Sequence, residues 1–94
     1  MRTTITANGT GFITTTPDNH NNLYVFVDAA ATLGGGTLSI GVRDFKSSDS
    51  LFPIDTAMPA GAQNQYPVGG HVELHYTLSG ATTPSVTLMV TTGM

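Results

Sequence analysis

Residues 71–79 read HVELHYTLS, and apolar and polar residues alternate along the whole stretch. Successive side chains of a β-strand point to opposite faces, so this pattern predicts a strand that buries one face. The apolar face receives Val72, Leu74, Tyr76 and Leu78. The polar face receives His71, Glu73, His75, Thr77 and Ser79. Such a strand is typical of antiparallel sheets that pack against one another.

Other stretches of the chain read as strands of the same kind. Residues 37–45 and 85–92 repeat the period of two. Their inward residues are expected to be Leu38, Ile40 and Val42, then Val86, Leu88 and Val90. Residues 23–28, LYVFVD, are apolar on both faces, which predicts a central strand with Phe26 in the core. Residues 51–55 predict a short edge strand, because Pro53 has no N–H for a central ladder.

The composition supports the same fold class. Sixteen of the 94 residues are threonine and 11 are glycine. Threonine favours strands and glycine favours tight turns, and no helical period is sustained anywhere. Turn signals recur at roughly 8–12-residue spacing, as in sandwiches. The sequence therefore predicts an all-β protein, a single compact antiparallel β-sandwich of about six to seven short strands over residues 1–94.

The two ends of this domain are expected to differ. We assign the sandwich core to residues 23–92 and an N-terminal arm or hairpin to residues 1–22. Asn8-Gly9 suits a type I′ turn, so residues 2–7 and 10–16 are predicted to pair, or to form an extended arm that pairs on docking. Residues 56–70 read as a long loop, and such loops are usually binding elements or packed against something.

Charge and composition exclude several function classes. Only 10% of the residues are charged, the net charge is −3 and three residues are basic. Three basic residues are too few to form the positive patch that binds DNA or RNA, and we therefore expect no nucleic-acid partner. No apolar run approaches the ~20 residues of a membrane span, so we expect no membrane partner. The chain has no cysteine, which rules out disulfides and thiolate metal sites.

His71, Glu73 and His75 are the residues of this chain that most resemble a reactive centre. Residues i and i+2 of a strand lie ~6.6–6.8 Å apart, and i and i+4 lie ~13 Å apart. A metal binds imidazole nitrogen at ~2.1 Å, so a shared ion needs both rings to lean inward or ligands from a second chain. A polar stripe facing solvent or an interface is the favoured interpretation. Metal binding and general acid–base catalysis are the alternatives, and we expect no catalytic residue, no cofactor and no enzymatic activity.

The remaining polar candidates are five aspartates, which fall at strand ends or in loops: Asp18, Asp28, Asp44, Asp49 and Asp55. Turn caps are the favoured interpretation, with a Ca²⁺ site as the alternative. Large aromatic residues are the other candidates for contact. Phe26 and Tyr76 are expected in the core. Phe45, Phe52 and Tyr66 border loops and are predicted as interface anchors, with the periphery of the core as the alternative.

Two long segments carry a family resemblance. Residues 23–55, LYVFVDAAATLGGGTLSIGVRDFKSSDSLFPID, and 66–90, YPVGGHVELHYTLSGATTPSVTLMV, resemble small β-sandwich virion proteins of tailed bacteriophages. The shared plan is a strand, a Gly-rich turn, the strand GTLSIGV, a Ser/Asp turn, an FP edge and two paired strands. The likeness covers roughly residues 23–92.

The resemblance implies a capsid decoration, or cement, protein on the outer surface of the head. Its partners would be the major capsid protein and further copies of itself, as a trimer. It would lie on the virion, and in the host cytoplasm during assembly. Independently of the resemblance, we expect the Thr-rich N-terminal arm with Arg2, Thr3, Thr4 and Ile5 to add a strand to a sheet edge of the shell. A tail, baseplate or fibre-associated sandwich and a carbohydrate-binding module are the alternatives.

Overall fold

The structure is a computed structural model that describes residues 1–93, and it contains eight β-strands. The strands are β1 (Arg2–Ile5), β2 (Gly9–Thr15), β3 (Asn22–Val27), β4 (Thr37–Asp44), β5 (Phe52–Asp55), β6 (Gln63–Tyr66), β7 (Val72–Ser79) and β8 (Val86–Gly93). Within residues 1–93 there is no helix long and apolar enough to cross a membrane. The predicted all-β class is confirmed.

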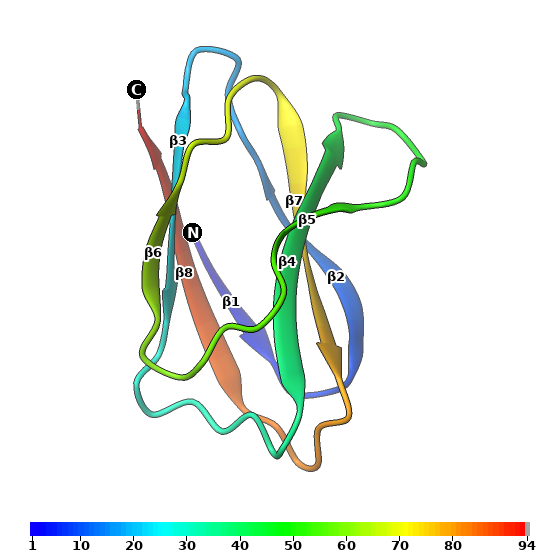
Figure 1. Cartoon of the computed structure of the whole chain (residues 1–94), viewed down its shortest axis with the longest axis vertical. Coiled ribbons are helices and arrows are strands. Elements are labelled where there is room, and N and C mark those ends of the chain that lie inside the picture. Colours follow the sequence, from blue (N-terminus) through cyan, green and yellow to red (C-terminus); the bar gives the residue numbers. More distant parts are fainter. Residues whose placement is uncertain (94) are drawn as a thin grey trace.

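The strands form two four-stranded antiparallel sheets that face each other (Figure 1). Sheet A has the order β1-β8-β3-β6, and sheet B has the order β2-β7-β4-β5. In this order β1 pairs with β8, β2 with β7, β3 with β6 and β4 with β5. The chain is thus one long hairpin wrapped into two layers, which is the strand order of a jelly roll.

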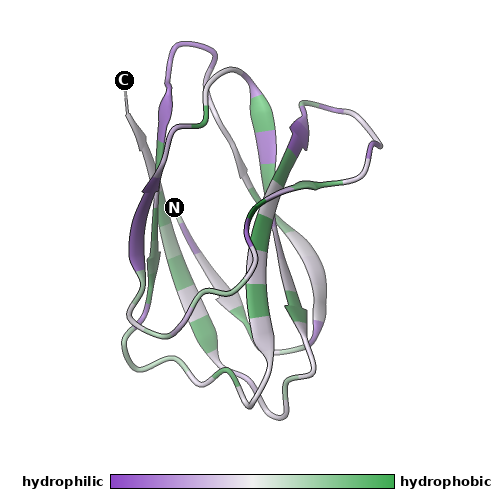
Figure 2. Ribbon diagram, viewed as in Figure 1, coloured by the Kyte–Doolittle hydropathy of each residue, from purple (hydrophilic) through white to green (hydrophobic). Residues whose placement is uncertain are grey.

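The core lies between the sheets and follows the alternation of the sequence. Leu38, Ile40, Leu74, Leu78, Val86, Leu88 and Val90 are all buried, as predicted. Figure 2 shows apolar residues recurring along these strands. Burying each such side chain contributes roughly 1.5–3 kcal/mol, so this shared inner face is what holds the two layers together.

The predicted N-terminal hairpin is wrong. β1 joins sheet A and β2 joins sheet B, so the Asn8-Gly9 link passes between the layers instead of closing a turn within one. Asn8 Nδ2 donates to the Ala81 carbonyl at 3.0 Å, and Ala81 N donates to Asn8 Oδ1 at 2.9 Å. Ile5 is 1% exposed. Residues 2–5 are therefore an edge strand of the sandwich, and no extended arm forms.

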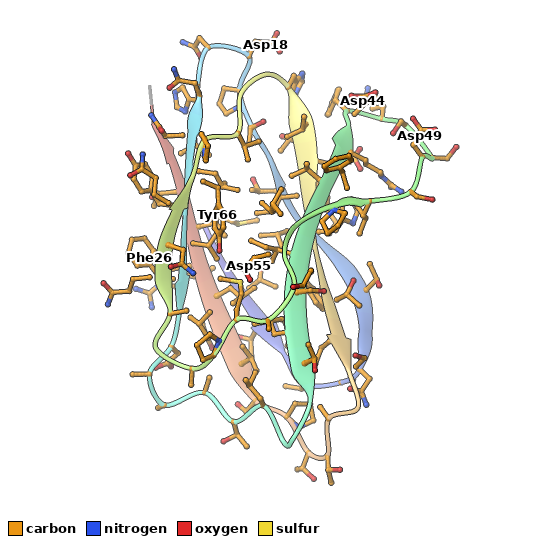
Figure 3. The ribbon with its side chains drawn as sticks, in the orientation of Figure 1. Asp18, Phe26, Asp44, Asp49, Asp55 and Tyr66 are labelled. Atoms are coloured by element: carbon orange, nitrogen blue, oxygen red, sulfur yellow. The ribbon has the colours of Figure 1, made fainter. Side chains whose placement is uncertain are left out.

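Two aromatic residues also depart from expectation. Phe26 is only partly buried, because its side chain alternates with Val25 and Val27 and lies on the outer face of sheet A (Figure 3). Residues 1–93 form two layers and place no third one over that face, so the apolar strand β3 is buried on one side only. Tyr76 packs against the core but is also partly exposed. Its ring lies over Gly11 on β2, where a Cβ atom would collide with it.

The predicted loop over residues 56–70 contains a strand, β6, which raises the strand count to eight. Its sequence, QNQY, has no apolar alternation to mark it. Tyr66, predicted as an interface anchor, points from β6 toward Asp55 on β5 (Figure 3). Its hydroxyl donates to Asp55 Oδ2 at 2.6 Å. Burial above all, and then this hydrogen bond, raises the pKa of Tyr66 to about 12. Tyr66 thus joins the two sheets at their β5–β6 side.

Candidate interaction face on sheet B

The outer face of sheet B carries a linked set of polar side chains centred on Glu73. β7 is a central strand, and Glu73 points outward because Leu74 beside it is fully buried in the core. Arg43 Nε on β4 donates to Glu73 Oε1 at 3.1 Å, and the Lys46 amide donates to Oε2 at 2.9 Å. His75 Nε2 lies 3.0 Å from Oε1. Both carboxylate oxygens are therefore engaged.

These contacts favour the charged form of Glu73. Its pKa is lowered to about 2, first by the hydrogen bond from His75, then by the Lys46 amide and by Arg43. The Glu73 side chain is only 13% exposed. A carboxylate held ionised by three donors is a poor proton donor or acceptor near neutral pH. Glu73 is therefore a structural anion on β7 that binds the C-terminal end of β4 and the residues that follow it.

His75 points outward, as predicted, yet it is not exposed to solvent. Its Cα partner on β2 is Phe12, whose ring meets the imidazole edge-on at 5.5 Å between centroids. The side chain of His75 is 11% exposed, whereas Phe12 is 53% exposed. The predicted polar stripe does face outward here, but an aromatic neighbour shields the His75 ring from solvent.

His71 belongs to a different contact. Its ring stacks on Phe45 at 3.8 Å between centroids, and its Nδ1 lies 3.7 Å from Asp18 Oδ1. Within residues 1–93, no group of three or more His, Asp or Glu side chains is placed to hold a metal ion. His71 and His75 therefore do not converge, and His71 instead connects the loop that carries Phe45 to the loop that carries Asp18.

A row of paired residues with the apolar Phe12 and Pro53 at its ends crosses the same face. Phe12 and His75 are followed by Gly41 on β4, and Gly41 pairs with Pro53 on β5. Leu51 lies against Gly41, where a Cβ atom would be 3.2 Å from the Leu51 Cβ. A shallow hollow of about 180 Å³ lies beside this row, lined by Ser39, Ile40, Gly41, Leu51, Pro53 and Thr77. We call this surface, from Phe12 to Pro53 with its hollow, the sheet B face.

The exposed aromatic residues concentrate on sheet B and its loops. Phe52 is 74% exposed and Phe45 is 38% exposed. Phe52 lies on the edge strand β5, and Phe45 follows the end of β4. Phe52 and the free face of Phe45, which stacks on His71, are exposed, whereas the Tyr66 hydroxyl is bonded to Asp55. Their role as interface anchors stays a prediction. Exposed rings of this kind are the residues most often found at the centre of protein interfaces.

The other predicted contact residues lie on β1. Arg2 and Thr4 are exposed, Thr3 is half-buried and Ile5 is in the core. Their pairing with β8 leaves only one side of the strand for a partner. The sequence missed Phe12, Leu51 and Pro53 as members of a common surface. Only the register that sets β2, β7, β4 and β5 side by side brings them together, and no local pattern encodes that register.

Comparison of the chain with protein-family models, with curated proteins and with solved structures finds no significant match. The assignment of the fold accordingly rests on the strand order and pairing of the chain itself.

Replacing Glu73 with glutamine should reduce the loss of unfolding free energy that the protein shows as the pH falls below 4.5. The pKa of Glu73 is about 2 in the folded protein, against 4.5 ordinarily, so its contribution is fully present above about pH 4.5. That contribution is lost as the pH falls from 4.5 toward 2. Urea unfolding should show wild type more stable than Glu73→Gln at pH 7, with the difference closing below pH 4.5.

The matched control for this experiment is Asp49→Asn, which removes an exposed carboxylate from the loop after β4. It should not produce the same convergence with wild type. A Glu73→Gln difference that stayed constant from pH 7 to pH 2 would contradict the assigned role of the carboxylate.

Proposed function

We propose that this protein is a structural component of a tailed-phage virion that decorates the outer surface of the capsid. The observation that carries the proposal is a jelly roll whose exposed aromatic residues, Phe12, Phe45 and Phe52, all lie on sheet B or in its loops. Jelly rolls occur in viral capsid and lectin domains, although a fold alone does not decide a function. The resemblance of residues 23–92 to small virion proteins of tailed phages supports the capsid option.

The chemistry of the sheet B face suits a shell contact. Phe12, Leu51 and Pro53 offer apolar area, while Ser39 and Thr77 offer hydroxyls around the hollow. Contacts of this kind depend little on ionic strength, because few charges take part. A protein bound at many copied sites, and to further copies of itself, gains from effective concentration even when each contact is weak. The partners proposed are therefore the major capsid protein and the chain itself.

A second candidate function is carbohydrate binding, since lectin domains share the jelly-roll order. The hollow on the sheet B face combines Ser39 and Thr77 with the apolar Leu51 and Pro53, which suits a sugar ring. A glycan array separates the two candidates. Hits that disappear in a Thr77→Val variant would favour the lectin reading, and an array without hits would remove it.

The copy number in purified particles tests the capsid proposal. Quantitative mass spectrometry of particles of the phage that encodes this protein should count hundreds of copies per particle. A few to a few tens of copies would place the protein in the tail, baseplate or fibre instead. Its absence from particles would overturn the proposal.

A further inference from the structure

The four edge strands of the sandwich differ in how they resist pairing with another chain. β5 carries Pro53 and a register shift, and β2 carries a register shift after Phe12. β1 presents the charge of Arg2. Proline, bulges and charges are the usual means by which proteins block an exposed edge. β6 (Gln63–Tyr66) has no proline, no charged residue and no register shift against β3.

The open side of β6 presents an ordered set of main-chain groups. Val27 N donates to the Ala62 carbonyl at 2.8 Å, so Ala62 occupies a hydrogen-bonded position opposite β3. Residues of an antiparallel ladder alternate between hydrogen-bonded and non-hydrogen-bonded positions. Asn64 therefore directs its main-chain groups toward β3, while Gln63 and Gln65 direct theirs away. Two N–H and two C=O groups thus face outward from one short strand.

We propose that β6 pairs antiparallel with β6 of a second copy of this chain, around a two-fold axis through Asn64. In this register Gln63 of each copy lies opposite Gln65 of the other. The two outward N–H groups of each copy donate to the two outward C=O groups of the other, which gives four main-chain hydrogen bonds. The two sheets A become one continuous eight-stranded sheet. The proposal concerns self-association only and does not depend on the capsid function.

The side chains explain why the partner is another copy. Gln63, Asn64 and Gln65 are exposed and uncharged, so a two-fold axis sets no like charges opposite one another despite the net charge of −3. Figure 2 shows β6 as a markedly hydrophilic strand. Stacked amide side chains stabilise strand pairing between identical segments. A highly charged or strongly apolar partner segment would find no matching group on this edge.

The pair should be weak in solution. Four residues per copy bury far less than the roughly 1,600 Å² of a standard interface. The contact would gain strength where copies are held close together, as on a repeating surface. A two-fold pair also differs from the trimer that the family resemblance implies, so the mass of the oligomer separates the two.

Gln65→Pro tests the proposal. The Gln65 N–H faces away from β3, so proline removes no hydrogen bond within the sheet while it removes a donor to the second copy. Sedimentation equilibrium from about 10 µM to 1 mM should show wild type moving from monomer to dimer. Gln65→Pro should remain monomeric over the whole range. Amide exchange at Gln63 and Gln65 should slow in wild type as its concentration rises.

Thr4→Pro on β1 is the matched control. The Thr4 N–H also faces away from its sheet. Met1 and Val90 form a hydrogen-bonded pair, and the alternation along β1 makes Thr4–Thr87 a non-hydrogen-bonded pair. Each variant loses one exposed side-chain contact, Thr4–Thr87 or Gln65–Asn22. Thr4→Pro should dimerise like wild type. If circular dichroism shows that Gln65→Pro does not fold, Asn64→Lys replaces it in the test. That substitution places a lysine of one copy opposite a lysine of the other, and their repulsion opposes the pairing.

Three results would overturn the proposal. Wild type could remain monomeric at 1 mM, it could form a trimer, or the variant at position 64 or 65 could dimerise as wild type does.

Discussion

Gly34→Ala should destabilise the protein by about 3 kcal/mol, enough to remove much of the stability of a small domain. Gly34 has φ = +61°, a left-handed conformation that costs an L-residue roughly 1–2 kcal/mol. Its carbonyl accepts a hydrogen bond from Thr82 N at 2.9 Å, and a Cβ atom at this position would collide with the Thr82 backbone. The adjacent pair Thr32–Ser85 holds the same two connections together with two hydrogen bonds of 2.9 Å. These hydrogen bonds hold the β3–β4 and β7–β8 connections too close together to admit an added methyl group.

Gly35→Ala is the control for this effect. Gly35 also has positive φ, at +76°, but a Cβ atom there meets nothing within 4 Å. It should cost only the left-handed term of about 1–2 kcal/mol. Urea unfolding of both variants gives the comparison. Equal losses at positions 34 and 35 would contradict the close packing of the two connections.

Local alternation predicted the inner faces correctly where strands bury one side. Leu38, Leu74 and Leu88 lie in the core because a period of two allows them no other common face. Phe26 was misplaced because an apolar residue in a strand does not reveal how many layers the protein has. β6 was missed because QNQY is a strand through its pairing with β3, and its composition resembles a polar loop.

The hairpin prediction failed for a related reason. Asn8-Gly9 permits a tight turn, but the long-range pairing of β1 with β8 and β2 with β7 sends its two flanks into different sheets. Apart from the β4–β5 pair, the strands of this jelly roll pair with strands farther along the chain. Short-range turn signals therefore identify breaks without identifying partners.

In the candidate site too, the sequence predicted the direction of side chains but not their contacts. The outward direction of Glu73 and His75 followed from the sequence. The exposure of Phe45 and Phe52 did not, because the sequence left them open between an interface and the periphery of the core. The burial of His75 under Phe12, and the engagement of both Glu73 oxygens, depend on residues more than 25 positions away in the chain. Only the register of β2, β7 and β4 specifies those contacts.

Phe12→Ala should weaken attachment to the capsid by tenfold or more if the sheet B face is the contact. Truncating an aromatic residue at the centre of an interface typically costs about 2 kcal/mol or more, and about 1.4 kcal/mol is tenfold. Phe12 is 53% exposed, so its loss should change the stability of the free protein only slightly. Tyr24→Ala is the matched control, since Tyr24 is a partly exposed aromatic residue on the outer face of sheet A.

The most direct test is therefore the binding of purified protein to mature capsids, measured by co-sedimentation over a concentration series. Wild type and Tyr24→Ala should bind saturably and alike, and Phe12→Ala should need at least about tenfold more protein for half-saturation. Failure of wild type to bind, or equal binding by Phe12→Ala, would contradict a capsid protein that docks through this face.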